Sequence, residues 1–408
     1  MADLTALFVS ESVTLAQVVR LAVLARAVPP EVRVVFAASR FDPLVFDGLV
    51  AERISVTSPP ADKVLRAVDE GRPFHDVRSL EAAIEEDREV LARVRPDVVV
   101  GDLRPSLAIS ARLAKVPYAN LINAYWSPHA VRDRIPMPDH PIVSLVGVAR
   151  AERYFPRALP KVFAHFAEPF RAVRRRHGVA DIQDLFELLL DGDHALFPDV
   201  PVLAPLRQKR QNEHYLGAIP WQPPGAPPGW WAELDPARPV VYVTLGSSGK
   251  VQRLPLVLEA LADLPVQVVV ATAGRTELTS PPSNVRWAEL LPGELAASRA
   301  AVVVSNGGST TGYQALAAGK PVVGIASNLD QYLAMDAMAR AGVGILLRAG
   351  TLRAAEVKRA VSRAFEDAAL KARAAGIGRE IARYDARARF VAWLMDVCHL
   401  PTIEVRHA

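Results

Sequence analysis

Residues 301–336 most constrain what this chain can fold into, because two buried strands there enclose a glycine turn and a helix. The β-branched run 302–304 is typical of a strand in a parallel sheet. A helical pattern at 313–318 ends at Gly319, and a second buried strand follows at 322–325. Strand, turn, helix and strand in this order form half of a nucleotide-binding α/β sheet.

The turn itself offers a site for a phosphate. Gly307 and Gly308 let a ligand approach the backbone closely. Three hydroxyl residues then open the helix: Ser309, Thr310 and Thr311. The free N–H groups and the dipole of a helix N-terminus favour a bound anion. Because glycine turns also serve backbone geometry alone, a purely structural role stays open for this turn.

Asp330 and Gln331 follow the second strand, so they lie at the same carboxyl edge of the sheet, where ligands of such folds bind. A carboxylate beside an amide can hold several sugar hydroxyls through hydrogen bonds. The stretch therefore predicts a diphosphate site and a sugar site at consecutive strand ends.

This stretch resembles the donor-binding motif of family 1 nucleotide-sugar glycosyltransferases of the bacterial natural-product (macrolide) type. The matching positions are Gly307, Gly308, Thr311, Ala315, Leu316, Gly319, Pro321, Asp330 and Gln331. The chain departs at Asn306, where the family usually has a His on the diphosphate. It departs again at Gln314, where a Glu usually holds the ribose hydroxyls. Both replacements keep hydrogen-bonding capacity and remove a titratable group.

Length and composition limit the class of protein. The 408 residues, 50% hydrophobic and 23% charged, indicate two globular domains. With one cysteine, Cys398, and no basic segment at the N-terminus, we expect a cytoplasmic protein without a signal peptide. We expect no integral membrane segment, because no apolar run is long enough to span a bilayer. The net charge is +4, and the basic cluster at 171–176 is interpreted as a solvated helix face, so no nucleic-acid partner is expected.

Strands that alternate with helices predict two doubly wound α/β domains. Strands are expected at 4–9, 32–37, 97–102, 116–122, 240–245, 266–271 and 284–287, in addition to the stretch at 301–336. Helices are expected at 15–27, 79–94, 105–114, 254–261, 353–366 and 372–396.

An insertion and a linker separate the two halves. Residues 123–141 form a loop rich in aromatic residues and proline, and two or three helices are expected at 142–154, 159–177 and 182–190. The Pro- and Gly-rich segment 219–239 is interpreted as a stiff linker. We therefore assign residues 1–218 to an N-terminal domain and 240–408 to a C-terminal domain.

The resemblance implies the GT-B fold, in which two doubly wound Rossmann-like domains face each other across a cleft. The C-terminal domain then binds the nucleotide sugar, the N-terminal domain binds the acceptor, and the last helix crosses back to the N-terminal domain. The resemblance also places Gly246, Ser247 and Ser248 against the donor phosphates, and Leu290 and Leu291 in the loop that binds the base. For the nearby Trp287, a core role is favoured over a role in the site.

A general base is implied on the acceptor side, because transfer to a hydroxyl requires a group that takes its proton. The family uses a His after the first strand, held by an Asp after a later strand. Asp102 lies where that Asp is expected, but Ser12 occupies the position of the His. Gln17 is the other polar candidate in that segment, and neither Ser nor Gln is a base near neutral pH.

Three accounts of the missing base stay open. In the first, Asp102 or Glu11 accepts the proton directly, which suits an acidic acceptor such as a phenol or enol. In the second, His129 or His140 of the insertion supplies the base. In the third, the chain binds the donor without catalysing transfer.

We expect an inverting, metal-independent transfer of a sugar from UDP or dTDP to a small lipophilic natural-product acceptor. The helix dipole at Thr310 and Thr311 would stabilise the leaving diphosphate, so no metal or cofactor is expected besides the nucleotide sugar. The acceptor is expected to contact the loop with Tyr125, Trp126 and His129. The alternatives are a catalytically inactive donor-binding or partner protein of the same fold, and a nucleotide-sugar epimerase. The sequence does not predict an oligomeric state.

Overall fold

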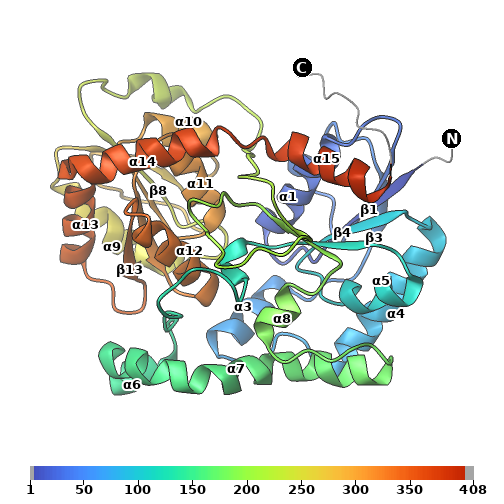
Figure 1. Cartoon of the computed structure of the whole chain (residues 1–408). Helices are drawn as coiled ribbons and strands as arrows, with labels where there is room; N and C mark the ends of the chain where they lie inside the picture. The colour runs from blue at the N-terminus through green and yellow to red at the C-terminus, as the bar shows by residue number, and fades with distance from the viewer. Residues whose placement is uncertain (1–3, 400–408) are drawn as a thin grey trace. The chain divides into compact units, whose positions relative to one another are not determined.

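The protein, in a computed structural model that describes residues 4–399, separates into two compact units. Unit 1 comprises Met1–Val131, Arg153–Ile219 and Tyr384–Ala408, and unit 2 comprises Arg132–Glu152 and Pro220–Arg383. Each unit contains a parallel β-sheet flanked by helices (Figure 1). Near-continuous apolar strands produce this arrangement, because a parallel sheet buries both of its faces.

The sheet of unit 1 has seven parallel strands in the order β3-β2-β1-β4-β5-β6-β7. The strands are β1 (Thr5–Ser10), β2 (Arg33–Ala38), β3 (Glu52–Ser55), β4 (Val98–Asp102), β5 (Tyr118–Leu121), β6 (His194–Phe197) and β7 (Glu213–Tyr215). The connecting helices are α1 (Leu15–Arg26), α2 (Pro43–Phe46), α3 (Ala61–Asp69), α4 (Val77–Val94), α5 (Leu107–Ala114) and α8 (Leu185–Leu189), with a short 3-10 helix η1 (Ala124–Trp126). In the register of β1 with β4, Ser10 lies opposite Asp102, so the residues that follow each strand meet at one edge.

The helical insertion differs from the expectation. After the short helix α6 (Pro141–Val146), one continuous helix, α7 (Val148–Arg176), replaces the two helices expected there, despite prolines at 156, 160 and 169. Pro156 and Pro160 are exposed, so water can hydrogen-bond to the carbonyl groups that each proline leaves free in the preceding turn.

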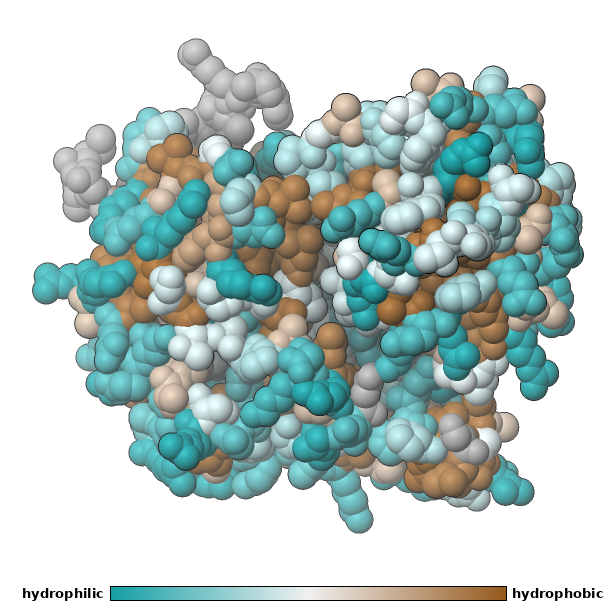
Figure 2. All heavy atoms as spheres, turned by 180° about the vertical axis from the view of Figure 1, so that it is seen from behind, coloured by the Kyte–Doolittle hydropathy of each residue, from teal (hydrophilic) through white to brown (hydrophobic). Residues whose placement is uncertain are grey.

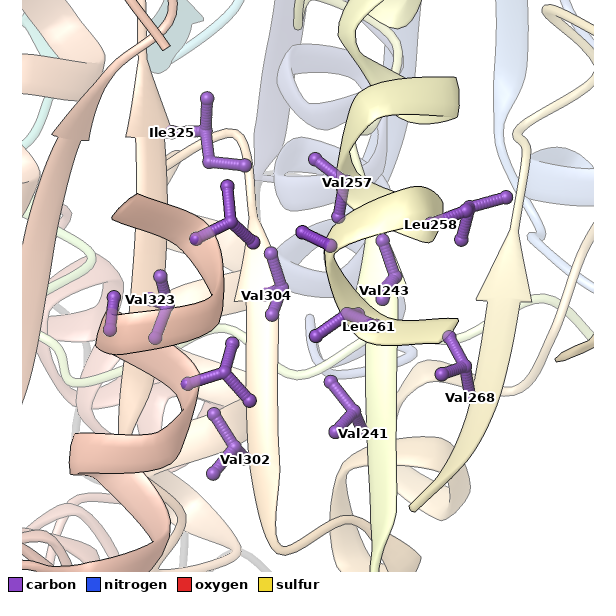
Figure 3. Close-up of a cluster of buried hydrophobic side chains, with 14 of the residues drawn as sticks. Val241, Val243, Val257, Leu258, Leu261, Val268, Val302, Val304, Val323 and Ile325 are labelled. Carbon is purple, nitrogen blue, oxygen red and sulfur yellow. The ribbon is translucent and has the colours of Figure 1, made fainter. Parts of the chain in front are cut away.

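The sheet of unit 2 has six parallel strands in the order β10-β9-β8-β11-β12-β13. The strands are β8 (Val240–Thr244), β9 (Gln267–Ala271), β10 (Val285–Ala288), β11 (Val302–Ser305), β12 (Val322–Ala326) and β13 (Gly344–Arg348). The helices are α9 (Leu254–Ala262), α10 (Gly293–Arg299), α11 (Ser309–Ala317), α12 (Leu329–Arg340), α13 (Ala354–Glu366) and α14 (Ala368–Ile381), with 3-10 helices η2 (Gly229–Glu233) and η3 (Val251–Arg253). Valines of β8 and β11 pack against Val257 and Leu261 of α9 in the core of this unit (Figure 3).

The end of the chain forms two helices instead of the single one expected at 372–396. The helical conformation is interrupted between α14 and α15 (Ala386–Val397). The Asp385 carboxylate accepts hydrogen bonds there from the N–H groups of Arg387 and Ala388 at 3.0 Å and so caps the start of α15. Helix α15 belongs to unit 1. The fully buried ring of Phe390 packs there against Phe8 of β1, with ring centroids 5.9 Å apart.

One segment of the expected N-terminal domain, Arg132–Glu152, belongs to unit 2. Asp139 holds it there: its N–H donates to the Ser327 carbonyl at 2.8 Å, and its carboxylate accepts from the Gly350 N–H at 2.6 Å and the Tyr332 hydroxyl at 3.0 Å. Arg348 adds an ion pair to Asp139 at 3.5 Å. The long loop therefore packs at the carboxyl edge of β12 and β13, a long-range contact that local sequence patterns do not reveal.

Candidate donor and acceptor sites

The expected phosphate turns lie on neighbouring strands of unit 2. The turn at Gly246–Ser248 follows β8, the turn at Asn306–Gly308 follows β11, and these strands are hydrogen-bonded to each other. Because the strands are parallel, both turns lie at the same carboxyl edge, where ligands of doubly wound sheets bind. Ser247 and Ser248 thus reach the edge from which helix α11 starts.

Asn306 connects the two turns. Its Nδ2 donates to Ser248 Oγ at 3.2 Å, and its Oδ1 accepts from the Gly308 N–H at 3.1 Å. A Cβ at Gly249 would approach Asn306 Cβ to 2.8 Å, so only glycine fits beside it. One polar atom of the amide therefore links the two turns, the other stabilises its own turn, and the second hydrogen of Nδ2 remains for a ligand.

Helix α11 begins at this edge with Gly308 as its N-cap. Gly308 has no side chain that could cap the helix, and the first turn consists of the partly exposed Ser309, Thr310 and Thr311. Gly307 has a φ of +79°, and a Cβ there would lie 2.7 Å from Met335 Cγ, so both backbone and space require glycine. A helix N-terminus with three hydroxyl side chains is suited to a diphosphate.

The two amides of the motif have structural partners. The carbonyl of the buried Gln331 accepts from the N–H and the hydroxyl of Ser327 at 2.9 and 3.0 Å, and Gln331 completes the capping box of α12 with Asn328. Gln314 Nε2 donates to the Trp221 carbonyl at 2.8 Å. Asp330 lies in the first turn of α12, next to this buried glutamine.

The loop expected to bind the base follows β10. Leu290 is exposed, whereas Leu291 is buried. Trp287 of β10 packs against the core of unit 2, in agreement with the core role favoured for it. Leu290 is therefore the apolar side chain of this loop that is available to cover a base.

On the other unit, Asp102 differs from the free carboxylate that the base hypothesis requires. It is fully buried at the end of β4. Arg20 donates two hydrogen bonds to its carboxylate, from Nε to Oδ2 at 2.9 Å and from Nη2 to Oδ1 at 2.8 Å. Arg20 also donates to Asn123 Oδ1 at 3.0 Å. A carboxylate in a bidentate arginine pair is stabilised in its ionised form and is a poor proton acceptor.

Glu11, directly after β1, has a different environment. Its carboxylate is nearly buried and lies 3.8 Å from Arg104, too far for a hydrogen bond. Arg104 instead donates to Asp87 Oδ1 at 2.8 Å and Glu86 Oε2 at 2.9 Å. Burial, only partly offset by Arg104 and reinforced by Asp87 and Glu86, raises the pKa of Glu11 to about 8.

Comparison with known proteins identifies the family. Residues 255–394 match the family described as "Erythromycin biosynthesis protein CIII-like, C-terminal domain". A "PGL/p-HBAD biosynthesis glycosyltransferase" of Mycobacterium tuberculosis is 46% identical over 365 residues, which are 89% of this chain and 85% of that protein. The chain belongs to the family 1 glycosyltransferases of the macrolide type. This glycosyltransferase is also 47% identical over 358 residues (87% of the chain, 79% of the relative) to a "PGL/p-HBAD biosynthesis rhamnosyltransferase" of Mycobacterium bovis.

Solved structures show the fold of this glycosyltransferase to be GT-B. A spinosyn forosaminyltransferase matches with a TM-score of 0.69 and 18% identity, covering 98% of this chain and all of the other. The glycosyltransferase of kitacinnamycin matches with a TM-score of 0.67 and 20% identity over the same shares. At these identities the likeness establishes the fold alone.

Ser12 and Gln17, the residues at and near the expected position of the His, hold the loop after β1. Gln17 Oε1 accepts from the Thr14 N–H at 3.0 Å and completes the capping box of α1. Ser12 has a φ of +58°, and its N–H donates to Ser10 Oγ at 3.2 Å. A left-handed serine beside a buried glutamate marks local strain of the kind found at functional sites.

Two of the three residues expected to contact the acceptor are buried. Tyr125 and Trp126 in η1 are buried, and the Trp126 ring lies 6.2 Å from that of Phe186. His129, half-buried, lies 3.5 Å from an Arg210 nitrogen. His140 accepts from the Ile142 N–H at 3.2 Å and caps α6, which gives it a structural role.

One Asp-x-Asp spacing, Asp191-Gly192-Asp193, is occupied by structural contacts in unit 1. Asp191 pairs with Arg112 at 2.7 Å and with Arg174. Asp193 accepts from the Tyr118 N–H at 2.9 Å. These carboxylates are therefore committed to other groups of the protein.

Two arginines were not singled out from the sequence. Arg20 lies three residues after Gln17 and four before Leu24, on the buried face of α1. A charged residue on an apolar stripe is a sign of a buried ion pair, and this signal was available. The sequence around Arg104 does not indicate a buried ion pair, because its partners Asp87 and Glu86 on α4 are brought to it only by the fold.

Proposed function

We propose that this glycosyltransferase transfers a sugar from a nucleoside diphosphate to a hydroxyl of a lipophilic acceptor, with inversion and without a metal ion. The observation that carries the proposal is the first turn of α11, which joins a glycine turn, the N–H groups of a helix N-terminus and three hydroxyl side chains. The acceptor oxygen attacks the anomeric carbon, the bond to the diphosphate breaks, and its electron pair leaves with the diphosphate. The helix N-terminus stabilises that charge.

For the proton of the acceptor, we propose Glu11 as the base in place of Asp102. The Glu11 carboxylate lacks a hydrogen bond among residues 4–399, whereas the Asp102 carboxylate is held by Arg20. A carboxylate whose pKa is raised toward neutrality accepts a proton better than an ordinary one. An acidic hydroxyl, such as a phenol, matches such a base best.

For the donor, we propose a dTDP- or UDP-linked sugar, with dTDP-rhamnose as the first to test. One relative is named a rhamnosyltransferase, and a spinosyn rhamnosyltransferase with a TM-score of 0.66 to this chain was solved with thymidine diphosphate. In the proposed site, Asp330 binds sugar hydroxyls, Leu290 covers the base, and Asn306 and Gln314 use their remaining hydrogens on the nucleotide.

The test is to incubate the protein with dTDP-rhamnose, dTDP-glucose or UDP-glucose and a panel of phenols and macrolides, and to detect glycosides by mass. Product with a phenol, and none with Glu11→Gln, supports the proposal. Nucleotide binding without any product favours the inactive alternative. That alternative has a precedent, because an "Inactive PGL/p-HBAD biosynthesis glycosyltransferase" of Mycobacterium bovis is 43% identical over 258 residues, 62% of this chain and 70% of that protein.

A further inference from the structure

Exposed apolar side chains gather on α6 and the start of α7. Four large hydrophobic residues in residues 142–154 are exposed: Ile142, Leu145, Val146 and Tyr154. Leu145 is 84% exposed. Apolar side chains gather over α6 at the lower right of Figure 2. Single exposed hydrophobic residues are ordinary, but a local group of them marks an interaction site.

A basic stripe continues directly from this group along α7. Arg150, Arg153, Arg157 and Lys161 are exposed and follow one another at three- and four-residue spacings, so they share one face of the helix. The guanidinium groups of Arg153 and Arg157 lie 5.9 and 5.8 Å from the ring of Tyr154. The polar and apolar parts of the surface are therefore adjacent.

The charge of the stripe is not neutralised nearby. The only acidic residue between Pro141 and Lys161 is Glu152, which is paired with Arg134 and Arg348, each at 3.3 Å. Within residues 4–399, none of the four basic side chains of the stripe forms an ion pair. A partner for this surface must accordingly carry negative charges opposite the basic stripe and an apolar region that the side chains of α6 can enter.

We propose that α6 and the first turns of α7, here called the docking patch, bind the surface of an anionic membrane. The apolar side chains of α6 enter the interfacial layer, and the basic stripe binds lipid phosphates. A helix with exposed apolar residues and a basic face is typical of interfacial membrane binding. Within the described part of the chain, no helix is long and apolar enough to cross a membrane. The patch would bring the protein to a phase that dissolves a lipophilic acceptor.

The test is flotation of the full-length protein with vesicles of phosphatidylcholine alone or with added phosphatidylglycerol. Binding is expected to the anionic vesicles and to decrease at high salt. Each basic residue near an anionic surface contributes on the order of a five-fold change in affinity, so Arg153→Glu with Arg157→Glu is expected to weaken binding roughly 25-fold or more. Leu145→Glu is expected to weaken it at least about ten-fold, through loss of apolar burial.

Matched controls separate the patch from general effects of charge and exposure. Val50→Glu changes an isolated residue that is 91% exposed, and Lys358→Glu with Arg359→Glu reverses two exposed charges on α13. These variants are expected to bind vesicles like the original protein. Equal binding to neutral and anionic vesicles, or equal loss in the controls, would overturn the proposal. Vesicle binding needs no donor or acceptor, so its failure is independent of failure of the proposed transfer.

Discussion

Glu11 is the residue whose environment most affects the proposed chemistry. Its carboxylate is nearly buried, and Arg104, which lies 3.8 Å from it, is already hydrogen-bonded to Asp87 and Glu86. Exchange for glutamine keeps shape and removes the base, so Glu11→Gln is expected to lower kcat by about 10²- to 10⁴-fold with little change in the donor KM. In the original protein, kcat/KM is expected to rise with pH through an apparent pKa near 8, because the ionised carboxylate is the active form. Steady-state kinetics from pH 6 to about pH 9.5 measure both.

The control for that experiment is Asp102→Asn. Loss of the ion pair with Arg20 is expected to lower the stability of the folded protein. The pH dependence of kcat/KM is expected to stay, whereas Glu11→Gln is expected to abolish it. A folded Asp102→Asn enzyme with a flattened profile, beside a fully active Glu11→Gln enzyme, would assign the base to Asp102.

Burial of Glu11 also makes the stability of the folded protein decrease as the pH rises. The pKa of Glu11 is raised from 4.5 to about 8 on folding, so the folded state binds the proton more tightly. Its stabilising contribution is therefore full below pH 4.5 and is lost as the pH rises through 8. Glu11→Gln, which cannot ionise, is expected to match the original protein in urea unfolding at pH 5 and to exceed its stability at pH 9. Equal stability at both pH values would contradict this burial.

Asp330 and Gln331 are neighbours with different expected roles. Asp330→Ala is expected to weaken binding of the intact sugar nucleotide by about ten-fold while free nucleotide binds as before, because one hydrogen bond to a charged group is lost. Gln331→Ala is expected to weaken both ligands alike and to lower the Tm, because its carbonyl holds Ser327 and caps α12. Calorimetric titration with the two ligands distinguishes these patterns, and equal loss of both ligands in Asp330→Ala would remove the sugar role.

Local chemistry explains which of these residues were predictable. The glycines and hydroxyl residues at 307–311 follow directly from a strand and open a helix, so their sequence order already places them together. Arg20 and Asp102 are 82 positions apart, and only the register of β1 with β4 brings α1 beside that strand end. The sequence could therefore place Asp102 at the sheet edge without revealing that its charge is already paired.

At the level of elements, the segment Arg132–Glu152 shows how a loop acquires order from a distant partner. Asp139 accepts from Gly350 and Tyr332 and pairs with Arg348. Asp139→Ala is expected to destabilise the protein by about 1.5–3 kcal/mol, because hydrogen bonds to a charged group are lost. Asp133→Ala, in the exposed part of the same loop, is expected to have an effect below about 0.5 kcal/mol. Urea unfolding measures the difference, and similar values for the two variants would refute the anchoring role.

Helix boundaries in the same region were the least predictable feature. Prolines 156 and 160 argued for separate helices, since proline removes a hydrogen bond. Their exposure to water permits α7 to continue, and exposure is a property of the folded chain that local pattern does not contain. In contrast, nine of the thirteen strands within residues 4–399 were predicted, because their apolar runs are short, β-branched and bounded by turn residues. The other four, β3, β6, β7 and β13, were not predicted, because their three to five residues do not form such a run.

For the whole molecule, the position of α15 makes the two ends of the chain interdependent. Phe390 is fully buried against Phe8 and Trp393, with centroids 5.9 and 5.6 Å apart. Phe390→Ala is expected to cost about 3–5 kcal/mol, the range for loss of a buried aromatic ring. Thermal unfolding measures this, with Val50→Ala as an exposed control. A loss below about 1 kcal/mol would mean that α15 contributes little to unit 1.

The division of the chain into units has a consequence for protein engineering. The backbone passes between units after Val131, Glu152, Ile219 and Arg383. A chimera cut once at the linker would combine the 132–152 segment of one parent with the sheet of unit 2 from another. Asp139 would then contact Tyr332 and Gly350 of a different parent. If unit 2 binds the donor as proposed, exchange of sugar specificity between such enzymes requires transplanting 132–152 together with 220–383, and leaving α15 with the recipient.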